Sequence, residues 1–143
     1  MTFALHHIGY LASDLEAAAA RWCADLGYLR DGPVHEDAFQ TAKVCFLRLP
    51  GHGPRLELIS PAGKDSKLSN ALRKGVTLHH LCYEVPKITD ALATLRGKGW
   101  LQLGEPAPAV AFGGRSIAWM MDKHGVLIEL LQSGPGPYQL KTT

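Results

Sequence analysis

The sequence contains few cysteines and no long hydrophobic run. Its three cysteines, Cys23, Cys45 and Cys82, are odd in number and widely separated, which excludes a disulfide framework and a CxxC metal pair. No stretch reaches the roughly 18 apolar residues that a membrane span needs, and residues 1–10 show no basic leader or cleavage pattern. We therefore expect buried cysteines in a cytoplasmic protein that has no membrane partner.

A strong excess of one charge is also missing. Lys and Arg number 15 against 13 Asp and Glu, which gives a formal net charge of +2, and the basic residues are scattered along the chain. Nucleic-acid-binding domains gather basic residues on one face, so we expect no nucleic-acid partner. Apolar residues make up 46% and charged residues 20% of the 143 positions, which is typical of one globular domain.

An internal repeat organises the chain. Residues 5–10 (LHHIGY) return as residues 78–83 (LHHLCY), and residues 56–59 (LELI) return as residues 128–131 (IELL). The offsets are 78 − 5 = 73 and 129 − 57 = 72, so two copies keep their register with one insertion or deletion between them.

Each copy begins with a short strand and continues with an amphipathic helix. In the first copy, residues 13–16 (SDLE) form a capping box, helix formers fill residues 17–26, and Gly27 ends the helix. In the second copy, Pro86 suits the first helical turn, and glycines at 97 and 99 end the run. The stretches rich in β-formers that follow each helix are residues 28–30, 42–49 and 55–60, and residues 100–103, 115–121 and 126–131.

The element order is therefore βαβββ in both copies. We predict a single α+β domain, residues 1–143, with internal modules 1–61 and 77–133, a linker at 62–76 and a loosely ordered tail at 134–143. In the linker, Asp65 or Ser66 could cap a short helix that ends near Leu72.

Polar residues matched by the repeat lie within apolar strands. One His of each first strand and one Glu of each last strand, Glu57 and Glu129, occupy equivalent positions. Equivalent positions of two copies related by a pseudo-twofold axis converge, and buried carboxylates need a partner, so a divalent cation is predicted between them. Imidazole and carboxylate ligands suit Zn, Mn, Co, Ni or Fe(II), and four ligands leave positions open for water or substrate.

Strand alternation leaves one choice open. Neighbours in a strand point to opposite faces, so only one of His6 and His7, and only one of His79 and His80, can enter such a site. Cys82 could project on the same face as His80. Three histidines without repeat partners are expected at the surface: His35, His52 and His124.

The repeated residues resemble the vicinal oxygen chelate superfamily, which includes glyoxalase I, methylmalonyl-CoA epimerases, extradiol dioxygenases, and fosfomycin or bleomycin resistance proteins. The resemblance covers residues 5–132 and is strongest to the epimerases, through residues 5–9, 56–61, 75–85, 112–114 (FGG) and 125–130 (GVLIEL). It implies two tandem βαβββ modules that pair into a cupped, open-barrel-like mixed sheet. It also implies that the second His of each pair is the ligand, so that His7, Glu57, His80 and Glu129 bind one divalent metal ion.

The same resemblance implies a metal-dependent isomerase or epimerase that abstracts a proton next to a carbonyl, on an acyl-CoA such as methylmalonyl-CoA. Glu129 is the first candidate for the catalytic base and Glu57 the second. We also expect a homodimer. The cationic residues available for an anionic substrate are Lys43, Arg48, Arg115 and Lys123.

Two alternatives share this scaffold. One is a glyoxalase I-like lyase, which uses the same four ligands. The other is a non-catalytic protein that binds a small molecule or antibiotic, for which residues 119–121 (WMM) would suit an apolar cleft. Three positions depart from the epimerase pattern: Cys45 aligns with a Glu of some epimerases, Ser116 with an Arg, and Met121 with a His.

Overall fold

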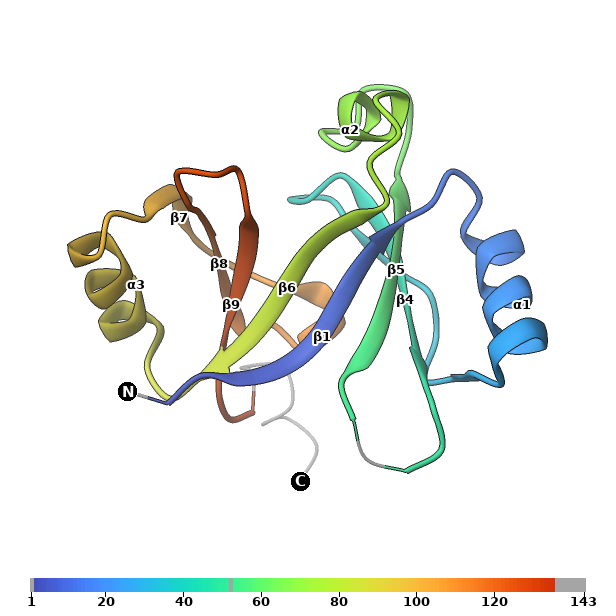
Figure 1. The fold of residues 1–143 in the computed structure, drawn as a ribbon, viewed down its shortest axis with the longest axis horizontal. Coiled ribbons are helices and arrows are strands. Elements are labelled where there is room, and N and C mark those ends of the chain that lie inside the picture. The colour runs from blue at the N-terminus through green and yellow to red at the C-terminus, as the bar shows by residue number, and fades with distance from the viewer. Residues whose placement is uncertain (1, 52, 136–143) are drawn as a thin grey trace. The chain divides into compact units, whose positions relative to one another are not determined.

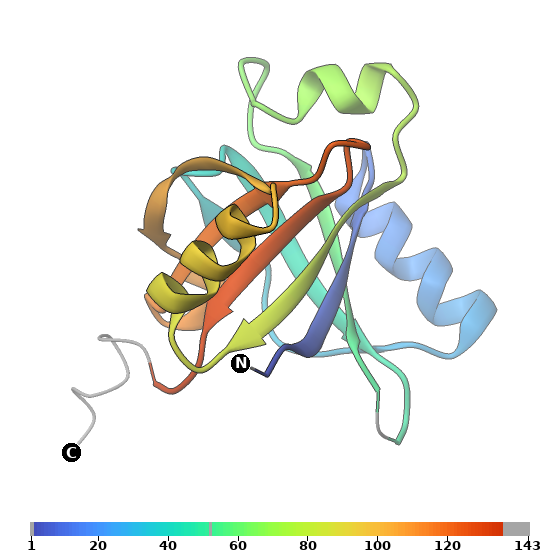
Figure 2. The same ribbon diagram turned by 60° about the vertical axis from the view of Figure 1, so that its left-hand side comes forward.

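The computed structural model describes residues 2–51 and 53–135, and Figures 1 and 2 show its ribbon from two directions. The chain divides into two compact units. The first unit is residues 7–79, and the second contains the residues before His7 and those after His79. The predicted modules 1–61 and 77–133 within one domain stay a prediction.

The sheet of the first unit has the strand order β2-β4-β5-β1, with β3 paired to β4. Its strands are β1 (Ala4–Leu11, of which residues 7–11 belong to this unit), β2 (Leu29–Arg30), β3 (His35–Asp37), β4 (Ala42–Arg48) and β5 (Arg55–Pro61). The strands β1 and β5 are parallel, whereas β4 runs antiparallel to β5. A parallel pair needs a long crossover, and the helix with the strands that follow it supplies this connection.

The helix α1 (Leu15–Leu26) has a defined cap at each end. The carboxylate of Asp14 accepts a hydrogen bond from the backbone nitrogen of Ala17 at 3.0 Å, which satisfies one of the N–H groups that a first turn leaves without a helical partner. The helix ends at Gly27, whose φ of 77° lies in the left-handed region that glycine adopts most easily. The predicted stop at Gly27 is confirmed.

The predicted capping box is wrong by one position. Asp14 caps the helix instead of Ser13, because Asp14 has the extended backbone that an N-cap adopts. The carboxylate of Glu16 does not reach back to the helix start as a capping box requires, and it pairs with the guanidinium of Arg30 on β2.

The core of the first unit lies between α1 and one face of its sheet (Figure 1). The buried side chains that form it are Leu15, Ala18, Ala19, Cys45, Leu47, Leu56 and Leu58. Burial of each of these leucines contributes about 1.5–3 kcal/mol. Because alternate residues of β4 and β5 point into this core, the residues between them point to the opposite face.

The second unit repeats the same arrangement. Its sheet has the order β6-β9-β8-β7, with β6 and β9 parallel and the other pairs antiparallel. The elements are β6 (Leu78–Val85), α3 (Ile88–Gly97), β7 (Leu101–Pro108), the 3-10 helix η1 (Val110–Phe112), β8 (Ser116–Met121) and β9 (Leu127–Gln132). Figure 2 shows α3 packed against this sheet. The buried core between them consists of Val85, Ile88, Ala91, Leu92, Leu95, Ala118, Met120, Ile128 and Leu130.

The start of α3 is capped from the far end of the unit. Its N-cap residue, Lys87, makes no side-chain cap. The side chain of Gln132 replaces it: Oε1 accepts from the backbone nitrogen of Ile88 at 2.9 Å, and Nε2 donates to the carbonyl of Pro86 at 2.6 Å. The end of β9 and the start of α3 are therefore held together.

The structure differs from the predicted elements in three further places. The strand β3 was not expected, and β7 continues to Pro108 after a register shift that follows Leu103. The linker helix α2 (Ser69–Arg73) has Leu68 at its N-cap, not Asp65 or Ser66. The hydroxyl of Ser66 donates instead to the carbonyl of Thr41.

Other predictions have mixed outcomes. Cys45 and Cys82 are buried as expected, whereas Cys23 is half-buried. Among the described residues, no helix is long and apolar enough to cross a membrane. Most of the predicted tail, residues 134–143, lies outside the described residues, and so does His52.

Candidate functional site

The first unit brings His7 and Glu57 together on the sheet face opposite α1. Glu57 on β5 lies opposite Gly9 on β1, and His7 precedes Gly9 by two residues, so its side chain shares that face. The imidazole Nε2 of His7 lies 3.6 Å from Oε2 of Glu57. His7 is 0% exposed and Glu57 5% exposed, so both polar groups are withdrawn from water.

The second unit brings His80 and Glu129 together in the same way. Glu129 on β9 lies opposite Cys82 on β6, which follows His80 by two residues. The imidazole Nε2 of His80 is 3.9 Å from Oε1 of Glu129, and the two residues are 2% and 4% exposed. The two pairs therefore repeat strand, register and atoms, as the sequence repeat predicts.

The chemistry of these donors fits a divalent metal ion. Bonds from a metal to imidazole nitrogen or carboxylate oxygen are about 2.0–2.2 Å long, so two ligand atoms of one ion lie no more than about 4.4 Å apart. The separations of 3.6 and 3.9 Å are within this limit, and they exceed the length of an ordinary hydrogen bond. Each pair can thus offer one nitrogen and one oxygen to a cation.

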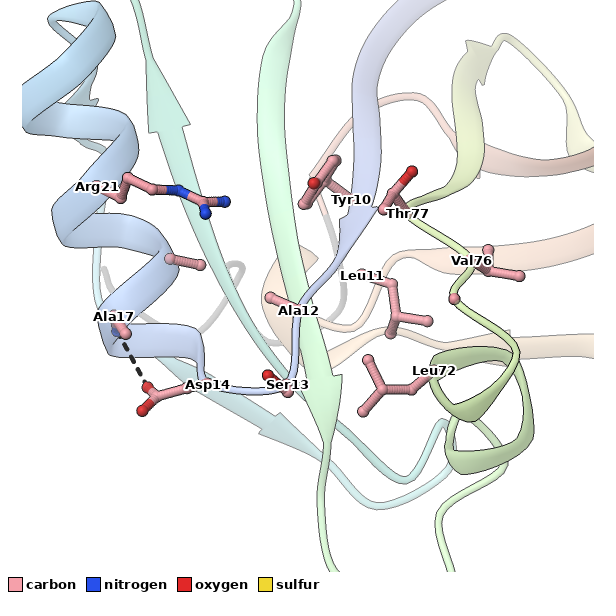
Figure 3. A pocket seen from close by; sticks show the side chains of 12 residues that line it. Tyr10, Leu11, Ala12, Ser13, Asp14, Ala17, Arg21, Leu72, Val76 and Thr77 are labelled. Carbon is pink, nitrogen blue, oxygen red and sulfur yellow. Dashed lines mark hydrogen bonds between the residues drawn. The ribbon is translucent and has the colours of Figure 1, made fainter.

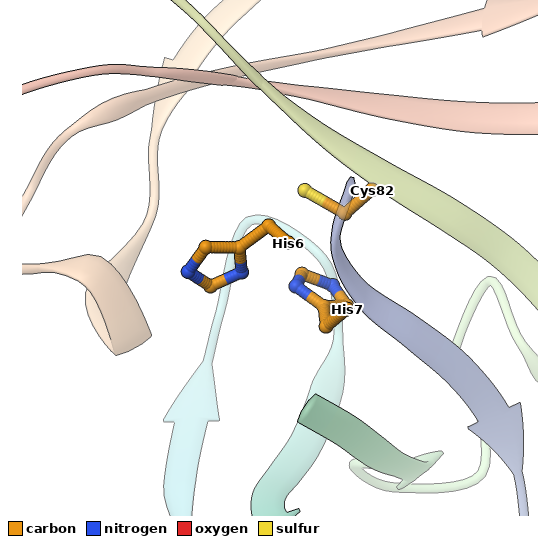
Figure 4. A group of neighbouring side chains, drawn as sticks. All are labelled: His6, His7 and Cys82. Carbon is orange, nitrogen blue, oxygen red and sulfur yellow. The ribbon is translucent and has the colours of Figure 1, made fainter. Parts of the chain in front are cut away.

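The two histidines of the first pair, His6 and His7, have different surroundings. His7 is buried and directs Nε2 towards Glu57, whereas His6 is half-buried and its ring packs edge to face against Phe112 with centroids 5.4 Å apart. Figure 4 shows His6 and His7 on β1 together with Cys82. A ring nitrogen of His6 and the thiol sulfur of Cys82, both in the second unit, lie within 4.8 Å of each other.

The three positions that depart from the epimerase pattern do not share one environment. Cys45 faces α1 in the first core, so it does not lie on the face that carries Glu57. Its burial raises the pKa of its thiol. Ser116 and Met121 are half-buried at the two ends of β8. Alternation along β4 places Val44 and Phe46 on the Glu57 face instead.

Arg115 is already engaged by neighbouring groups. Its guanidinium lies 3.7 Å from the carboxylate of Glu84, donates to the backbone carbonyl of Gln132 at 3.2 Å, and sits over the ring of Phe112. Of the other cations predicted to face a substrate, Lys43, Arg48 and Lys123 are exposed. Alternation along β4 places Arg48 on the Glu57 face, whereas Lys43 lies on the face of Cys45 and Leu47, beside the start of α1.

Two of the three histidines that were expected at the surface differ in exposure. His124 is exposed in the turn before β9, as expected. His35 is half-buried on β3, which pairs with β4, and not exposed as expected.

A pocket of about 420 Å³ lies on the first unit, and no sequence motif marks it (Figure 3). The end of β1, the first turns of α1 and residues 72–77 line it. Figure 3 shows Arg21 reaching from α1 towards Tyr10. None of the four candidate ligands lines this pocket, so we do not assign the chemistry to it.

The chain belongs to the glyoxalase/bleomycin resistance protein/dioxygenase superfamily, whose family model matches residues 6–119. Its relatives include CoA-thioester epimerases. It is 33% identical over 136 residues to the ethylmalonyl-CoA/methylmalonyl-CoA epimerase of Cereibacter sphaeroides, with 90% of this chain and 96% of that one covered. It is 32% identical over 135 residues to human mitochondrial methylmalonyl-CoA epimerase, with 90% of this chain and 73% of that one covered.

Solved structures show the same fold. A Streptomyces coelicolor methylmalonyl-CoA epimerase in complex with 2-nitronate-propionyl-CoA has a TM-score of 0.81 and 26% identity, covering 94% of this chain and 96% of that one. The predicted α+β vicinal oxygen chelate fold is therefore confirmed.

Proposed function

We propose that this protein is a metal-dependent epimerase of an acyl-CoA, with methylmalonyl-CoA as the first substrate to test. The observation that carries the proposal is the repeated pair of a buried His and a buried Glu, His7 with Glu57 and His80 with Glu129. The similarity to relatives that are named epimerases, which extends over 90% of this chain, supports the same reaction.

The four residues of the two pairs would hold one divalent ion among Co, Mn, Ni, Zn and Fe(II), whose ligand preferences include nitrogen and oxygen. When bound there, the ion supplies positive charge that stabilises a developing enolate. The protein residues hold the imidazole and carboxylate donors on a sheet face away from bulk water. A low-dielectric setting of this kind strengthens electrostatic stabilisation of the transition state.

The proton transfer is assigned to the carboxylates. Glu129 takes the proton from the carbon between the two carbonyl groups, and Glu57 is the second candidate. Each His–Glu pair, His7 with Glu57 or His80 with Glu129, is called a half-site. Epimerisation requires a proton to leave one face of the carbon and return to the other, so two carboxylates in equivalent half-sites suit the task. Exposed Arg48 and Lys123 are proposed to hold the anionic parts of a CoA thioester.

A cytoplasmic homodimer remains part of the proposal. Light scattering coupled to gel filtration gives the mass in solution, and a monomeric mass at micromolar concentration would remove the dimer while leaving the reaction proposal in place.

The test combines metal analysis with the reaction. The purified protein should contain about one equivalent of a divalent ion per chain, and re-adding Mn, Co, Ni or Zn after chelation should raise Tm. The reloaded protein should interconvert the two epimers of methylmalonyl-CoA, starting from either one, and the chelated protein should not. A loaded protein that leaves a single epimer unchanged contradicts the proposal. Binding of a small molecule by the metal-free protein would favour the non-catalytic alternative.

A further inference from the structure

Each half-site contains an aromatic ring that the sequence repeat did not reveal. Phe46 on β4 lies directly opposite Glu57, and its ring is 5.4 Å from that of His7 at an interplanar angle of 76°. Trp119 on β8 lies directly opposite Glu129, and its ring is 4.8 Å from that of His80 at 87°. In both units the imidazole therefore contacts a steeply inclined aromatic ring. That ring lies on the strand that pairs antiparallel with the strand carrying the Glu.

The two aromatic residues are equivalent in sequence as well. The spacing from Phe46 to Trp119 (119 − 46 = 73) equals the spacing from His7 to His80 (80 − 7 = 73). The residue type differs, phenyl in one copy and indole in the other, but the ring, the strand and the partner His are kept. The same contact therefore occurs twice, in two separately packed units.

Neither ring is part of a helix-covered core. The neighbours of Trp119, Ala118 and Met120, belong to the core under α3, and Cys45 and Leu47, the neighbours of Phe46, belong to the core under α1. Strand alternation directs Phe46 and Trp119 to the other face, where the His and Glu residues lie. Packing of the helix-covered cores therefore does not explain why both positions carry an aromatic residue.

A perpendicular ring restricts the imidazole in a specific way. The last side-chain torsion of His is broad, so packing must select the plane in which the ring lies. In both half-sites the selected plane directs Nε2 towards the carboxylate oxygen of the paired Glu. An edge-to-face contact with an aromatic ring favours one plane over its alternatives. Groups that orient metal-binding His residues affect metal affinity strongly.

We propose that Phe46 and Trp119 are positioning residues that hold the imidazole planes of His7 and His80 for metal binding. The inference rests on the metal site of the proposed function. It does not depend on the substrate, because the effect is exerted on the ligand rings. An aliphatic side chain of similar bulk fills the space but leaves the plane less restricted.

The decisive variants are Trp119→Leu and Trp119→Phe. Trp119→Leu removes the ring and should weaken Co²⁺ binding by about tenfold or more in isothermal titration, and alter the visible Co²⁺ spectrum. Trp119→Phe restores an aromatic ring of the type that Phe46 supplies, and should bind within about threefold of the wild type. Trp100→Leu is the matched control, because Trp100 packs against the core under α3 and away from His80. It should leave affinity and spectrum unchanged.

The outcomes separate the inference from the function. Wild-type affinity and an unchanged spectrum in folded Trp119→Leu would overturn the inference, and if that variant does not fold, the same readings on Phe46→Leu decide it. A wild type that binds Co²⁺ but does not epimerise methylmalonyl-CoA would remove the proposed reaction and leave the inference standing. A wild type that binds no divalent ion would overturn both.

Discussion

His7 and Glu57 face each other on neighbouring parallel strands, with Nε2 of the imidazole 3.6 Å from Oε2 of the carboxylate. This separation suits two ligands of one cation better than a direct hydrogen bond. Glu57→Gln keeps the shape of the side chain and removes its negative charge. The variant should bind the metal at least about tenfold more weakly and keep measurable epimerase activity at saturating metal.

Titration of the metal into Glu57→Gln, followed by kinetics at each metal concentration, separates the two possible roles of Glu57. Complete loss of activity at normal metal occupancy would make Glu57 the essential base and not only a ligand. Glu16→Gln serves as the control, because Glu16 pairs with Arg30 on the surface and should change neither property.

Burial of Cys45 makes stability depend on alkaline pH. Its thiol pKa is raised because burial disfavours the thiolate, so the unfolded chain loses this proton at lower pH than the folded protein. The contribution is fully present below about pH 8.5 and is lost as pH rises towards the pKa of the folded state. Cys45→Ala should therefore flatten the decline of Tm between about pH 8 and about pH 10. Identical slopes in the two proteins would contradict this, and Cys23→Ala provides the comparison.

Gln132 should stabilise the second unit without affecting the metal site. Its side chain supplies both an acceptor to Ile88 and a donor to Pro86 at the start of α3. Gln132→Ala should lower the free energy of unfolding by about 1 kcal/mol in urea denaturation. Gln132→Glu keeps the acceptor for Ile88 but sets a carboxylate oxygen against the carbonyl oxygen of Pro86, so it should also lower the free energy of unfolding. A change in Co²⁺ affinity in either variant would show that the cap is coupled to the metal ligands.

The repeat predicted that His7 matches His80 and that Glu57 matches Glu129, and the two pairs do take equivalent strand positions. The same pattern could not choose within each His pair, since alternation defines two faces and does not say which is used. The register does: Glu57 lies opposite Gly9, on the face of His7 and not of His6. Alternation also explains why Cys45, which aligns with a Glu of some epimerases, faces α1 and not the face of Glu57.

Features held by distant contacts were not predictable. The cap of α3 comes from Gln132, 44 positions beyond Ile88, so no local signal marks it. The strand β3 consists of His35, Glu36 and Asp37, which have weak intrinsic preference for strands and pair because β4 offers an edge. The equivalence of Phe46 and Trp119 is hidden in the sequence because the two residues differ in type, whereas the repeat is marked by nearly identical residues.

The most direct test of the account is hydrogen exchange in deuterated water. The metal-loaded wild type should exchange the hydrogen on the carbon between the carbonyl groups of racemic methylmalonyl-CoA, as measured by mass spectrometry. Glu129→Ala should abolish exchange, because it removes both a metal ligand and the proposed base, a loss of more than about 4 kcal/mol of transition-state stabilisation. His124→Ala, which alters an exposed turn, should exchange normally. No exchange in the metal-loaded wild type would contradict the assignment as an epimerase.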